Sequence, residues 1–438
     1  MFWNPAGLAT LGGAQLAVSA NSFSRLWREN QAYRPNRFFV TLPFYLEGLY
    51  VPDPANNGVW DYDLAQDTSY IVVYPDLGLD PFSEEAADWQ KDTTNFGLNS
   101  FAAAVPLKFL DRPVVLALAY RREFGLLDFD RNDTYLDPHL GYREYDFIER
   151  VSGIDTVEVS WYRFLRQRSG DLHTINGALA LELSKRVKVG IGLGMLFGKT
   201  DDLQSLNKVG YFNLYRENRF SFSYDTLDTE ITGTSTFQAV ELRTGCIVNF
   251  TNVSLGFSVT APHTLTRTWS YETSILPTEQ TSPTSDSGTD KLILPAAYAL
   301  GISFSPAEDF IFALDLERLP YSQARFELTG QDSTVYLWAD SRIIRFGVEY
   351  KPTDFFSLLA GYQYVPEVFV PDGAAFKDQG TAANRYILGA SIRVGRLGRL
   401  DIAYDLRELK YYDSYYSNTN YTLETANRLT VEYIYGFK

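Results

Sequence analysis

The last nine residues of the chain, 430–438, alternate in character with the period of a β-strand. One face carries Val431, Tyr433, Tyr435 and Phe437, and the other carries Thr430, Glu432, Ile434 and Gly436. The first face is apolar and ends in an aromatic residue, which is typical of a strand that faces lipid on one side. In lipid every backbone N–H and C=O group needs a partner, so a sheet containing such a strand must close on itself.

Length and composition extend this prediction to the whole chain. The 438 residues exceed the usual length of one soluble domain, whereas one large barrel with long loops accounts for them. Tyr and Phe occur 30 times each, and aromatic side chains gather at both interfaces of outer-membrane barrels. No apolar run approaches the roughly 18 residues of a transmembrane helix. We therefore expect an all-β fold, a closed antiparallel β-barrel in the bacterial outer membrane.

Charge and reactive residue types argue against several functions. The net charge is −15 and no basic stripe is present, so nucleic acid is not an expected partner. Cys246 is the single cysteine, and we interpret it as a small lipid-facing hydrophobe on an apolar strand face. His173 and His263 lack the neighbouring nucleophile motif that a hydrolase needs. We expect no catalytic residues and no cofactor.

Four aspartates fall in one predicted loop: Asp128, Asp130, Asp133 and Asp137. Oxygen ligands at such spacing could hold Ca²⁺, but the pattern lacks the spacing and the glycine of a calcium loop. A solvated acidic loop is the favoured interpretation, and no metal site is predicted.

Short and long connections alternate along the chain. The short ones contain mostly Pro, Gly, Asp or Asn and span 111–113, 184–186, 251–252, 305–309, 351–354 and 395–399. The long ones are polar and span 128–155, 199–236, 268–290, 320–341, 366–384 and 410–427. This alternation is typical of periplasmic turns and extracellular loops, and with a first strand at 15–23 and a last at 428–437 it gives about 14 strands. The alternative, a soluble β-sandwich with one wet face, seldom needs so many long strands in such regular hairpins.

Because successive side chains of a strand point to opposite faces, the sequence predicts which residues face lipid and which face the lumen. Phe312, Leu314 and Tyr404 fall on the lipid side, as do Tyr433 and Tyr435. The charges predicted to face the lumen are Asp315, Glu349, Arg345, Asp405, Arg407 and Glu432. On the lipid face a charge near the midplane would cost roughly 2–4 kcal/mol, whereas charges of both signs suit a solvated or hydrogen-bonded lumen.

Several motifs occur in a fixed order along most of the chain, from Asn4 to the C-terminal end. They span 4–9 (Asn-Pro-Ala-Gly-Leu-Ala), 15–16, 123–126 (Glu-Phe-Gly-Leu), 294–295, 299–302, 345–350, 360–362 and 370–372. Their order and spacing resemble those of the FadL/TodX-like (OMPP1) family of outer-membrane transporters for hydrophobic compounds, although Glu123 stands where the family has Pro. The resemblance implies a 14-stranded barrel plugged by an N-terminal hatch, a hydrophobic groove on the loop side, and lateral exit through the wall at a kinked third strand.

The N-terminal segment departs from the family. There the hatch contributes a few tens of residues before the Asn-Pro-Ala element, whereas only three precede it here. We expect residues 1–12 to be a remnant of the hatch and 13–438 to form the barrel with long extracellular loops. No signal peptide is visible, so we expect the encoded protein to extend upstream. The hatch and substrate-path residues implied by the resemblance are Phe2, Trp3, Asn4, Pro5 and Ala6, which should sit inside or beneath the lumen.

Glycines mark two further positions. Phe124, Gly125 and Leu126 correspond to the family's kink in the third strand, and Gly125 would tolerate broken pairing, although it could equally be a lumen-facing or bulge glycine. Gly190, Gly192, Gly194 and Gly198 share the inward face of one strand. They would leave space in the lumen or let the hatch approach the wall closely.

These observations favour a passive transporter for hydrophobic small molecules such as long-chain fatty acids or aromatic hydrocarbons. The expected partners are such a ligand, or a detergent-like lipid, together with outer-membrane lipid and lipopolysaccharide, and we expect a monomer. The alternatives are a non-transporting scaffold or a type IX secretion shuttle barrel of the same fold, and a general diffusion porin. A porin would show a constriction lined by opposed acidic and basic side chains.

Overall fold

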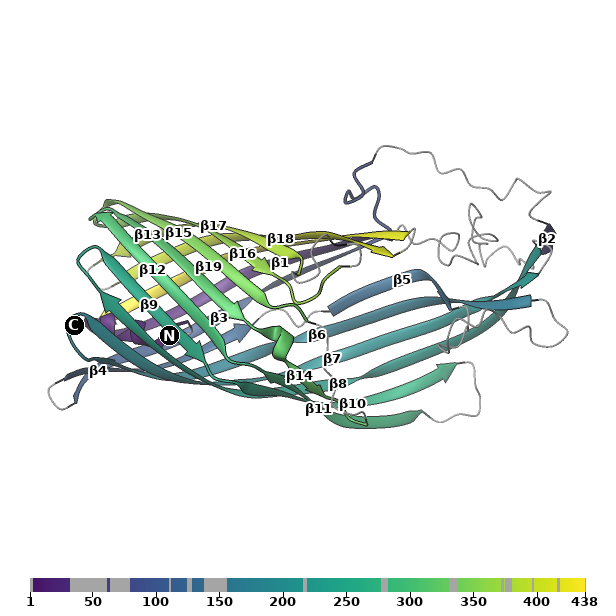
Figure 1. The fold of residues 1–438 in the computed structure, drawn as a ribbon, viewed down its shortest axis with the longest axis horizontal. Coiled ribbons are helices and arrows are strands. Elements are labelled where there is room, and N and C mark those ends of the chain that lie inside the picture. Colours follow the sequence, from purple (N-terminus) through teal and green to yellow (C-terminus); the bar gives the residue numbers. More distant parts are fainter. Residues whose placement is uncertain are drawn as a thin grey trace.

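The computed structural model describes most of the chain. The described residues are 3–31, 61–63, 79–109, 112–123, 128–137, 156–215, 219–276, 283–330, 338–371, 374, 380–395, 398–415 and 418–437. They form one elongated antiparallel barrel in which several strands project far beyond the others at one end (Figure 1).

The barrel wall consists almost entirely of long strands. In chain order they are β1 (Ala14–Gln31), β3 (Trp89–Phe109), β4 (Arg112–Glu123), β5 (Asp128–Asp137), β6 (Thr156–Glu182), β7 (Val187–Tyr215), β8 (Arg219–Asn249), β9 (Val253–Thr260), β10 (His263–Leu276), β11 (Thr284–Leu294), β12 (Ala297–Ala307), β13 (Phe310–Leu319), β15 (Ser341–Thr353), β16 (Phe356–Pro366), β17 (Ala382–Val394), β18 (Gly398–Tyr415) and β19 (Asn418–Phe437). The other elements within the described residues are two short strands, β2 (Asp61–Asp63) and β14 (Arg325–Glu327), and two 3₁₀ helices, η1 (Pro5–Thr10) and η5 (Tyr321–Gln323).

The first and last strands pair and close the sheet. The β1–β19 ladder runs from Ala14 opposite Phe437 to Gln31 opposite Asn420. Three wall strands each span two elements, β4 with β5, β9 with β10 and β11 with β12, and the closed barrel has 14 strands. The predicted fold class is confirmed. Among the described residues, no helix is long and apolar enough to cross a membrane.

Two of these wall strands are interrupted side by side, and proline causes both breaks. Pro262 separates β9 from β10, and Pro295 separates β12 from β11, while the register places Thr260 opposite Ala297 and His263 opposite Leu294. Proline has no backbone N–H to donate to a ladder. The break therefore divides a lower wall, β9 and β12, from an extended hairpin, β10 and β11.

The outer face is apolar. Phe312, Leu314, Tyr404, Tyr433 and Tyr435, the residues predicted to face lipid, are all exposed. Other large exposed side chains of the same belt are Leu116, Leu118, Leu179, Ile191, Leu193, Leu300, Phe346, Leu388 and Val431. Large apolar side chains over much of a surface are unfavourable in water and suit a lipid environment.

The predicted long loops are largely wrong, because the strands continue into them. β7 and β8 pair as far as Tyr215 and Arg219, well inside the predicted loop 199–236. β5 occupies the start of the predicted loop 128–155, and β10, β11, β18 and β19 are similarly extended. Backbone pairing does not require an apolar face, so polar residues with high β propensity prolong the ladder above the lipid.

Candidate functional site

The N-terminal segment lies against the inner wall and is anchored there by Asn4. The Nδ2 of Asn4 donates to the backbone carbonyls of Cys246, at 3.1 Å, and Phe257, at 3.2 Å. Its Oδ1 accepts from the backbone N–H of Ala6, at 3.0 Å, and so caps η1. One side chain therefore starts the helix and ties it to β8 and β9.

Two glycines of the wall make room for this segment. A Cβ built on Gly190 would lie 2.5 Å from the backbone N of Ala6, and one built on Gly245 would collide with the Asn4 side chain. At Gly192 the nearest atoms would be 3.7 Å away, which is ordinary contact. The sequence suggested that these glycines either leave space in the lumen or let the N-terminal segment approach the wall closely. At Gly190 the second interpretation applies.

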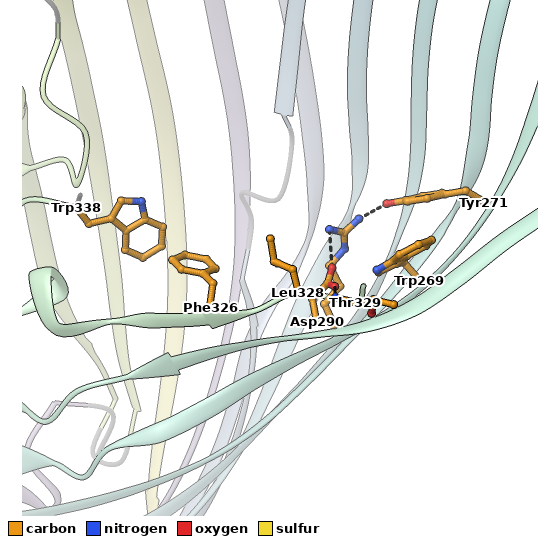
Figure 2. Close-up of a pocket in the computed structure, with 8 residues that line it drawn as sticks. Trp269, Tyr271, Asp290, Phe326, Leu328, Thr329 and Trp338 are labelled. Carbon is orange, nitrogen blue, oxygen red and sulfur yellow. Dashed lines mark hydrogen bonds and ion pairs between the residues drawn. The ribbon is translucent and has the colours of Figure 1, made fainter. Parts of the chain in front are cut away.

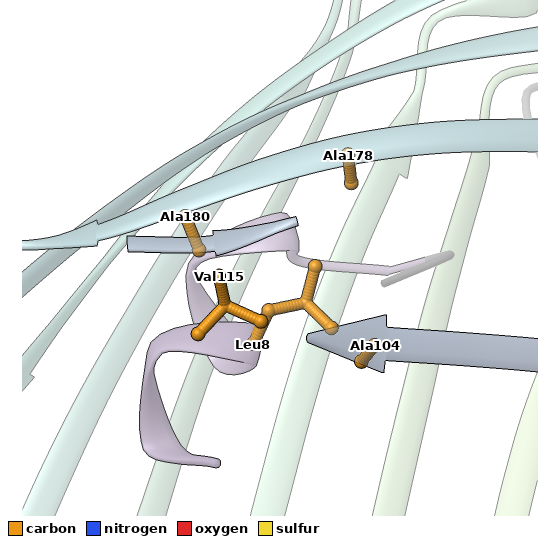
Figure 3. Close-up of a cluster of buried hydrophobic side chains, with 5 residues drawn as sticks. All are labelled: Leu8, Ala104, Val115, Ala178 and Ala180. Carbon is orange, nitrogen blue, oxygen red and sulfur yellow. The ribbon is translucent and has the colours of Figure 1, made fainter. Parts of the chain in front are cut away.

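An apolar contact holds η1 on its other side. Leu8 packs against Val115 of β4 and against Ala178 and Ala180 of β6, with Ala104 of β3 nearby (Figure 3). Val115 and Ala180 are almost fully buried. Small alanine side chains leave the space that Leu8 fills, so helix and wall fit without a large cavity.

Trp3 extends the segment toward a distant part of the wall. The guanidinium of Arg345, on β15, lies 4.3 Å from the centre of the Trp3 ring, and Arg345 also pairs with Glu317 at 2.6 Å. The segment thus contacts β6, β7 and β8 through η1 and β15 through Trp3. Of the five predicted hatch residues, Phe2 lies outside the described residues.

Replacing Asn4 with alanine should loosen this segment. Each of its bonds to the wall contributes roughly 0.5–1.5 kcal/mol net, so docking weakens by about 1–3 kcal/mol. Amide hydrogen exchange of residues 6–10 should become about tenfold faster or more, since 1.4 kcal/mol is tenfold in an equilibrium. Thr10→Ala is the matched control, because the Thr10 hydroxyl bonds only to the Gly7 carbonyl within the segment. Unchanged exchange in Asn4→Ala would show that other contacts hold the helix.

Most of the charges that were predicted to face the lumen form ion pairs with neighbouring side chains of the wall. Arg385 pairs with Asp405 at 2.7 Å, and Arg407 pairs with both Glu424 and Glu367 at 2.5 Å. Glu349 lies 3.6 Å from Lys351. These ion pairs join neighbouring side chains on the wall. They do not form the facing acidic and basic rows that mark a porin constriction.

Asp315 and Glu432, which were predicted to face the lumen, stand beside other charges in the sheet. Asp315 stands opposite Arg345 in the β13–β15 register, and Glu432 stands opposite Asp401 in the β18–β19 register. In both strands the flanking residues, Leu314 and Val431 among them, are exposed on the outer face.

The third strand is irregular where the kink was predicted. The β4–β6 ladder ends at Glu123 opposite Leu172, and the β5–β6 ladder begins at Asp128 opposite Arg168. Between these points β6 contains Gly170, whose φ of 153° is unusual for any residue with a side chain. Phe124, Gly125 and Leu126 lie outside the described residues, so the kink itself stays a prediction.

On the other side of the third strand, toward β3, the described backbone pairing covers only part of the strand. Backbone pairing between β3 and β4 is described from Phe109 to Ser100. Residues 89–99 of β3, here called the β3 edge, face β1 on their other side, where Trp89 to Leu98 are paired and the register shifts at Asn99. Within the described residues, side chains bridge this edge to the third strand. Trp89 meets Phe129 of β5 edge to face, with ring centres 5.0 Å apart.

Arg122 fills the middle of this boundary. Its guanidinium pairs with Asp171 of β6 at 2.5 Å and lies 2.9 Å from where a Cβ of Gly97 would stand. Phe96 and Leu98 on the same edge are exposed on the outer face. Side-chain contacts can open without breaking a backbone ladder.

A pocket of about 520 Å³ lies on the inner face of the extended hairpin, on the loop side of the barrel. Figure 2 shows the apolar side chains of Trp338, Phe326 and Leu328 in a row that leads to Trp269. The volume falls in the usual range for small-molecule sites. The segment after β13 forms one wall, because β14 pairs with β11 and brings Phe326 opposite Leu292.

Polar contacts fix the walls of the pocket. Thr329 bonds Thr289 through both the Thr289 N–H, at 2.7 Å, and its carbonyl, at 2.9 Å. Gly288 makes this possible, since a Cβ there would stand 2.5 Å from the Thr329 hydroxyl and 2.6 Å from the Trp269 ring. Trp269 in turn stacks on Tyr271 with ring centres 5.0 Å apart.

The sequence prediction missed this pocket. Its residues fall in the predicted loops 268–290 and 320–341, where no strand was expected. The signal that could have found it is the alternation of Arg267, Trp269 and Tyr271, which places three large side chains on one face of a strand. Its second wall comes from residues far along the chain, and nothing local in the sequence indicates that pairing.

The other sequence candidates have structural partners. Asp128 and Asp130 pair with Arg166, at 2.9 and 3.7 Å, and they belong to strand β5, which corrects the predicted acidic loop. In the described part of the chain no cluster of potential metal ligands occurs. His173 bonds the hydroxyl of Tyr120 at 2.9 Å, and His263 lies 3.1 Å from the Ala261 carbonyl.

Solved structures share this fold over most of their length. A FadL homologue of Pseudomonas aeruginosa matches with a TM-score of 0.61 at 13% identity, covering 100% of this chain and 93% of that one. The P. putida toluene transporter TodX matches with a TM-score of 0.56 at 11% identity, covering 99% and 93%. The Ralstonia pickettii toluene transporter TbuX matches with a TM-score of 0.50 at 14% identity, covering 100% and 93%. No family model and no curated protein sequence matches the chain.

A closed antiparallel barrel of 14 strands with an apolar outer belt defines a bacterial outer-membrane β-barrel protein. Its fold is that of the FadL/TodX-like outer-membrane proteins, the family that the order of motifs in the sequence resembles.

Proposed function

We propose that this barrel is a passive outer-membrane transporter for hydrophobic small molecules. The observation that carries the proposal is the presence, in one barrel, of an aromatic pocket on the loop side and a boundary at the β3 edge that side chains bridge. The neighbours described as toluene transporters and as a monoaromatic hydrocarbon channel support it. In this proposal outer-membrane lipid and lipopolysaccharide surround the apolar belt, and the protein acts as a monomer.

The route begins at the pocket. A hydrophobic molecule that leaves water for the space between Trp269, Phe326 and Trp338 gains roughly 25 cal/mol per Å² of apolar surface removed from water. The N-terminal segment blocks direct passage toward the short turns by crossing the lumen between the β6–β8 wall and β15. The molecule then moves sideways into the membrane at the β3 edge, where the Arg122–Asp171 pair must swing aside. Its concentration gradient supplies the driving force, and no chemical step is required.

A bulky side chain at Gly97 should close this lateral route. In Gly97→Trp the indole would occupy the space beside the Arg122 guanidinium, whose flexible end can shift, so the barrel should still fold. We expect uptake of a hydrophobic substrate to slow about tenfold, which corresponds to ~1.4 kcal/mol of added barrier. The measurement is the initial uptake rate in cells that produce equal amounts of each variant. Gly97→Ala is the control and should retain most of the activity.

Full activity of Gly97→Trp would place the exit elsewhere, for example along the barrel axis. No uptake by the unmodified protein would instead favour the scaffold or secretion-shuttle alternative. In that case the ion pairs on β13–β19 would serve a polar interior through which no hydrophobic molecule passes.

A further inference from the structure

We infer that the pocket of the extended hairpin accepts neutral aromatic molecules and rejects carboxylates of the same shape. This inference rests on the proposed function and names the class of substrate that enters there. It separates ring-shaped neutral compounds from fatty acids and other organic anions.

The apolar walls provide flat aromatic surfaces. Phe326 and Trp338 meet edge to face with ring centres 4.9 Å apart, and Trp269 lies at the other end of the pocket (Figure 2). Aromatic rings prefer offset-stacked or edge-to-face neighbours, which a planar guest can satisfy on several sides at once. Leu328 supplies the remaining apolar contact.

Among the described residues that line the pocket, Arg267 is the one cation, and its charge is already compensated. Its guanidinium lies 3.5 Å from the carboxylate of Asp290 and 3.6 Å from that of Asp202. Its Nε also donates to the Ser235 hydroxyl at 3.0 Å, and it bonds the Tyr271 hydroxyl. Asp202 pairs with Arg168 at 2.8 Å as well, so the cluster holds two arginines and two aspartates.

Because Arg267 is already paired with two aspartates, the pocket favours a neutral ligand over an anionic one. A carboxylate that approaches Arg267 from the pocket also approaches Asp290, whose side chain is only 15% exposed and is held by the Thr329 N–H at 3.0 Å. Like charges at a partly buried site repel more strongly than in water. The Tyr271 hydroxyl could have donated a hydrogen bond to an anionic ligand, but it donates to the Asp202 carboxylate instead, at 2.8 Å. A neutral guest meets no such penalty.

The test compares two ligands of the same shape, 2-naphthamide and the anion 2-naphthoate. Binding is measured by equilibrium dialysis against the full chain in lipid nanodiscs at neutral pH, with empty nanodiscs subtracted. We expect naphthamide to bind at least about tenfold more tightly, because like-charge juxtaposition costs more than the 1.4 kcal/mol that corresponds to tenfold. Trp338→Ala should weaken naphthamide binding, which places the ligand in this pocket.

A variant of the charge cluster sharpens the test. In Asp290→Asn the acceptor for the Thr329 N–H is kept while one negative charge is lost, so naphthoate should gain about tenfold in affinity relative to naphthamide. Asp202→Asn should also raise the affinity for naphthoate relative to naphthamide. It replaces Asp290→Asn in the test if that variant folds poorly. Glu272→Gln, an exposed carboxylate on the opposite face of β10, is the matched control and should leave the ratio unchanged.

Equal or tighter binding of naphthoate by the unmodified protein would overturn the inference, as would an unchanged ratio in both aspartate variants. Naphthamide binding that Trp338→Ala leaves intact would also overturn it, because the ligand would then sit elsewhere. None of these outcomes bears on uptake, which tests the proposed function separately.

Discussion

Valine in place of Gly190 is expected to drive the N-terminal segment away from the wall and to raise the ionic conductance of the barrel several-fold. A Cβ at this position would stand 2.5 Å from both the Ala6 nitrogen and the Pro5 carbonyl carbon, which are backbone atoms that cannot turn aside. Overpacking of this kind costs roughly 1–3 kcal/mol, which is comparable to the hydrogen bonds that Asn4 makes with the wall. The barrel keeps its own ladders and should remain folded.

Single-channel recording in planar bilayers measures this effect. Gly192→Ala is the matched control on the same strand face, because its new methyl group would find neighbours no nearer than 3.7 Å and should leave the conductance unchanged. A Gly190→Val barrel that conducts like the unmodified protein would mean that the N-terminal segment does not obstruct the lumen.

Arginine in place of Leu314 is expected to destabilise the barrel by roughly 2–4 kcal/mol, the cost of a cation near the middle of the bilayer. Leu314 lies mid-strand in β13 and is exposed, while its neighbour Asp315 stands opposite Arg345 in the β13–β15 register. Leu314→Gln separates the cost of charge from the loss of the leucine side chain. Reversible unfolding by guanidinium in lipid vesicles measures both, and equal losses for arginine and glutamine would mean that position 314 does not face lipid.

The architecture could be predicted from the sequence because it depends on a local repeat. Alternation of side chains in β13, β18 and β19 separates lipid from lumen residue by residue, and a shift of one residue would reverse both faces. Short turns such as 184–186 fix the hairpins, and their number fixes the strand count. The same reasoning placed Phe312 and Tyr404 on the outer face.

The extent of the strands could not be predicted in this way. Above the membrane apolar residues such as Leu203 and Leu206 occur at both odd and even positions of β7 among polar ones, so the alternation that marked the lower strands is lost although the ladder continues from Lys199 to Tyr215. The hydrogen bonds that prolong it belong to the backbone and leave no hydrophobic signature.

The candidate site was predicted in part. The Asn-Pro element indicated an N-terminal segment near the lumen, and its contact with Gly190 and Gly245 gives a reason for both glycines. The aromatic pocket depends on the pairing of β14 with β11, between residues about 35 apart in sequence, such as Lys291 and Glu327. A non-local contact of this kind is set by tertiary packing.

The central claim is that the protein carries hydrophobic small molecules passively across the outer membrane. The most direct measurement is the flux of a radiolabelled neutral aromatic compound across an asymmetric bilayer with a lipopolysaccharide outer leaflet, with and without the purified protein. A small sugar is measured alongside it. The account predicts that the protein accelerates the aromatic compound strongly and the sugar hardly at all, and that Gly97→Trp removes most of the acceleration. Equal acceleration of the two solutes, or no acceleration of either, would contradict it.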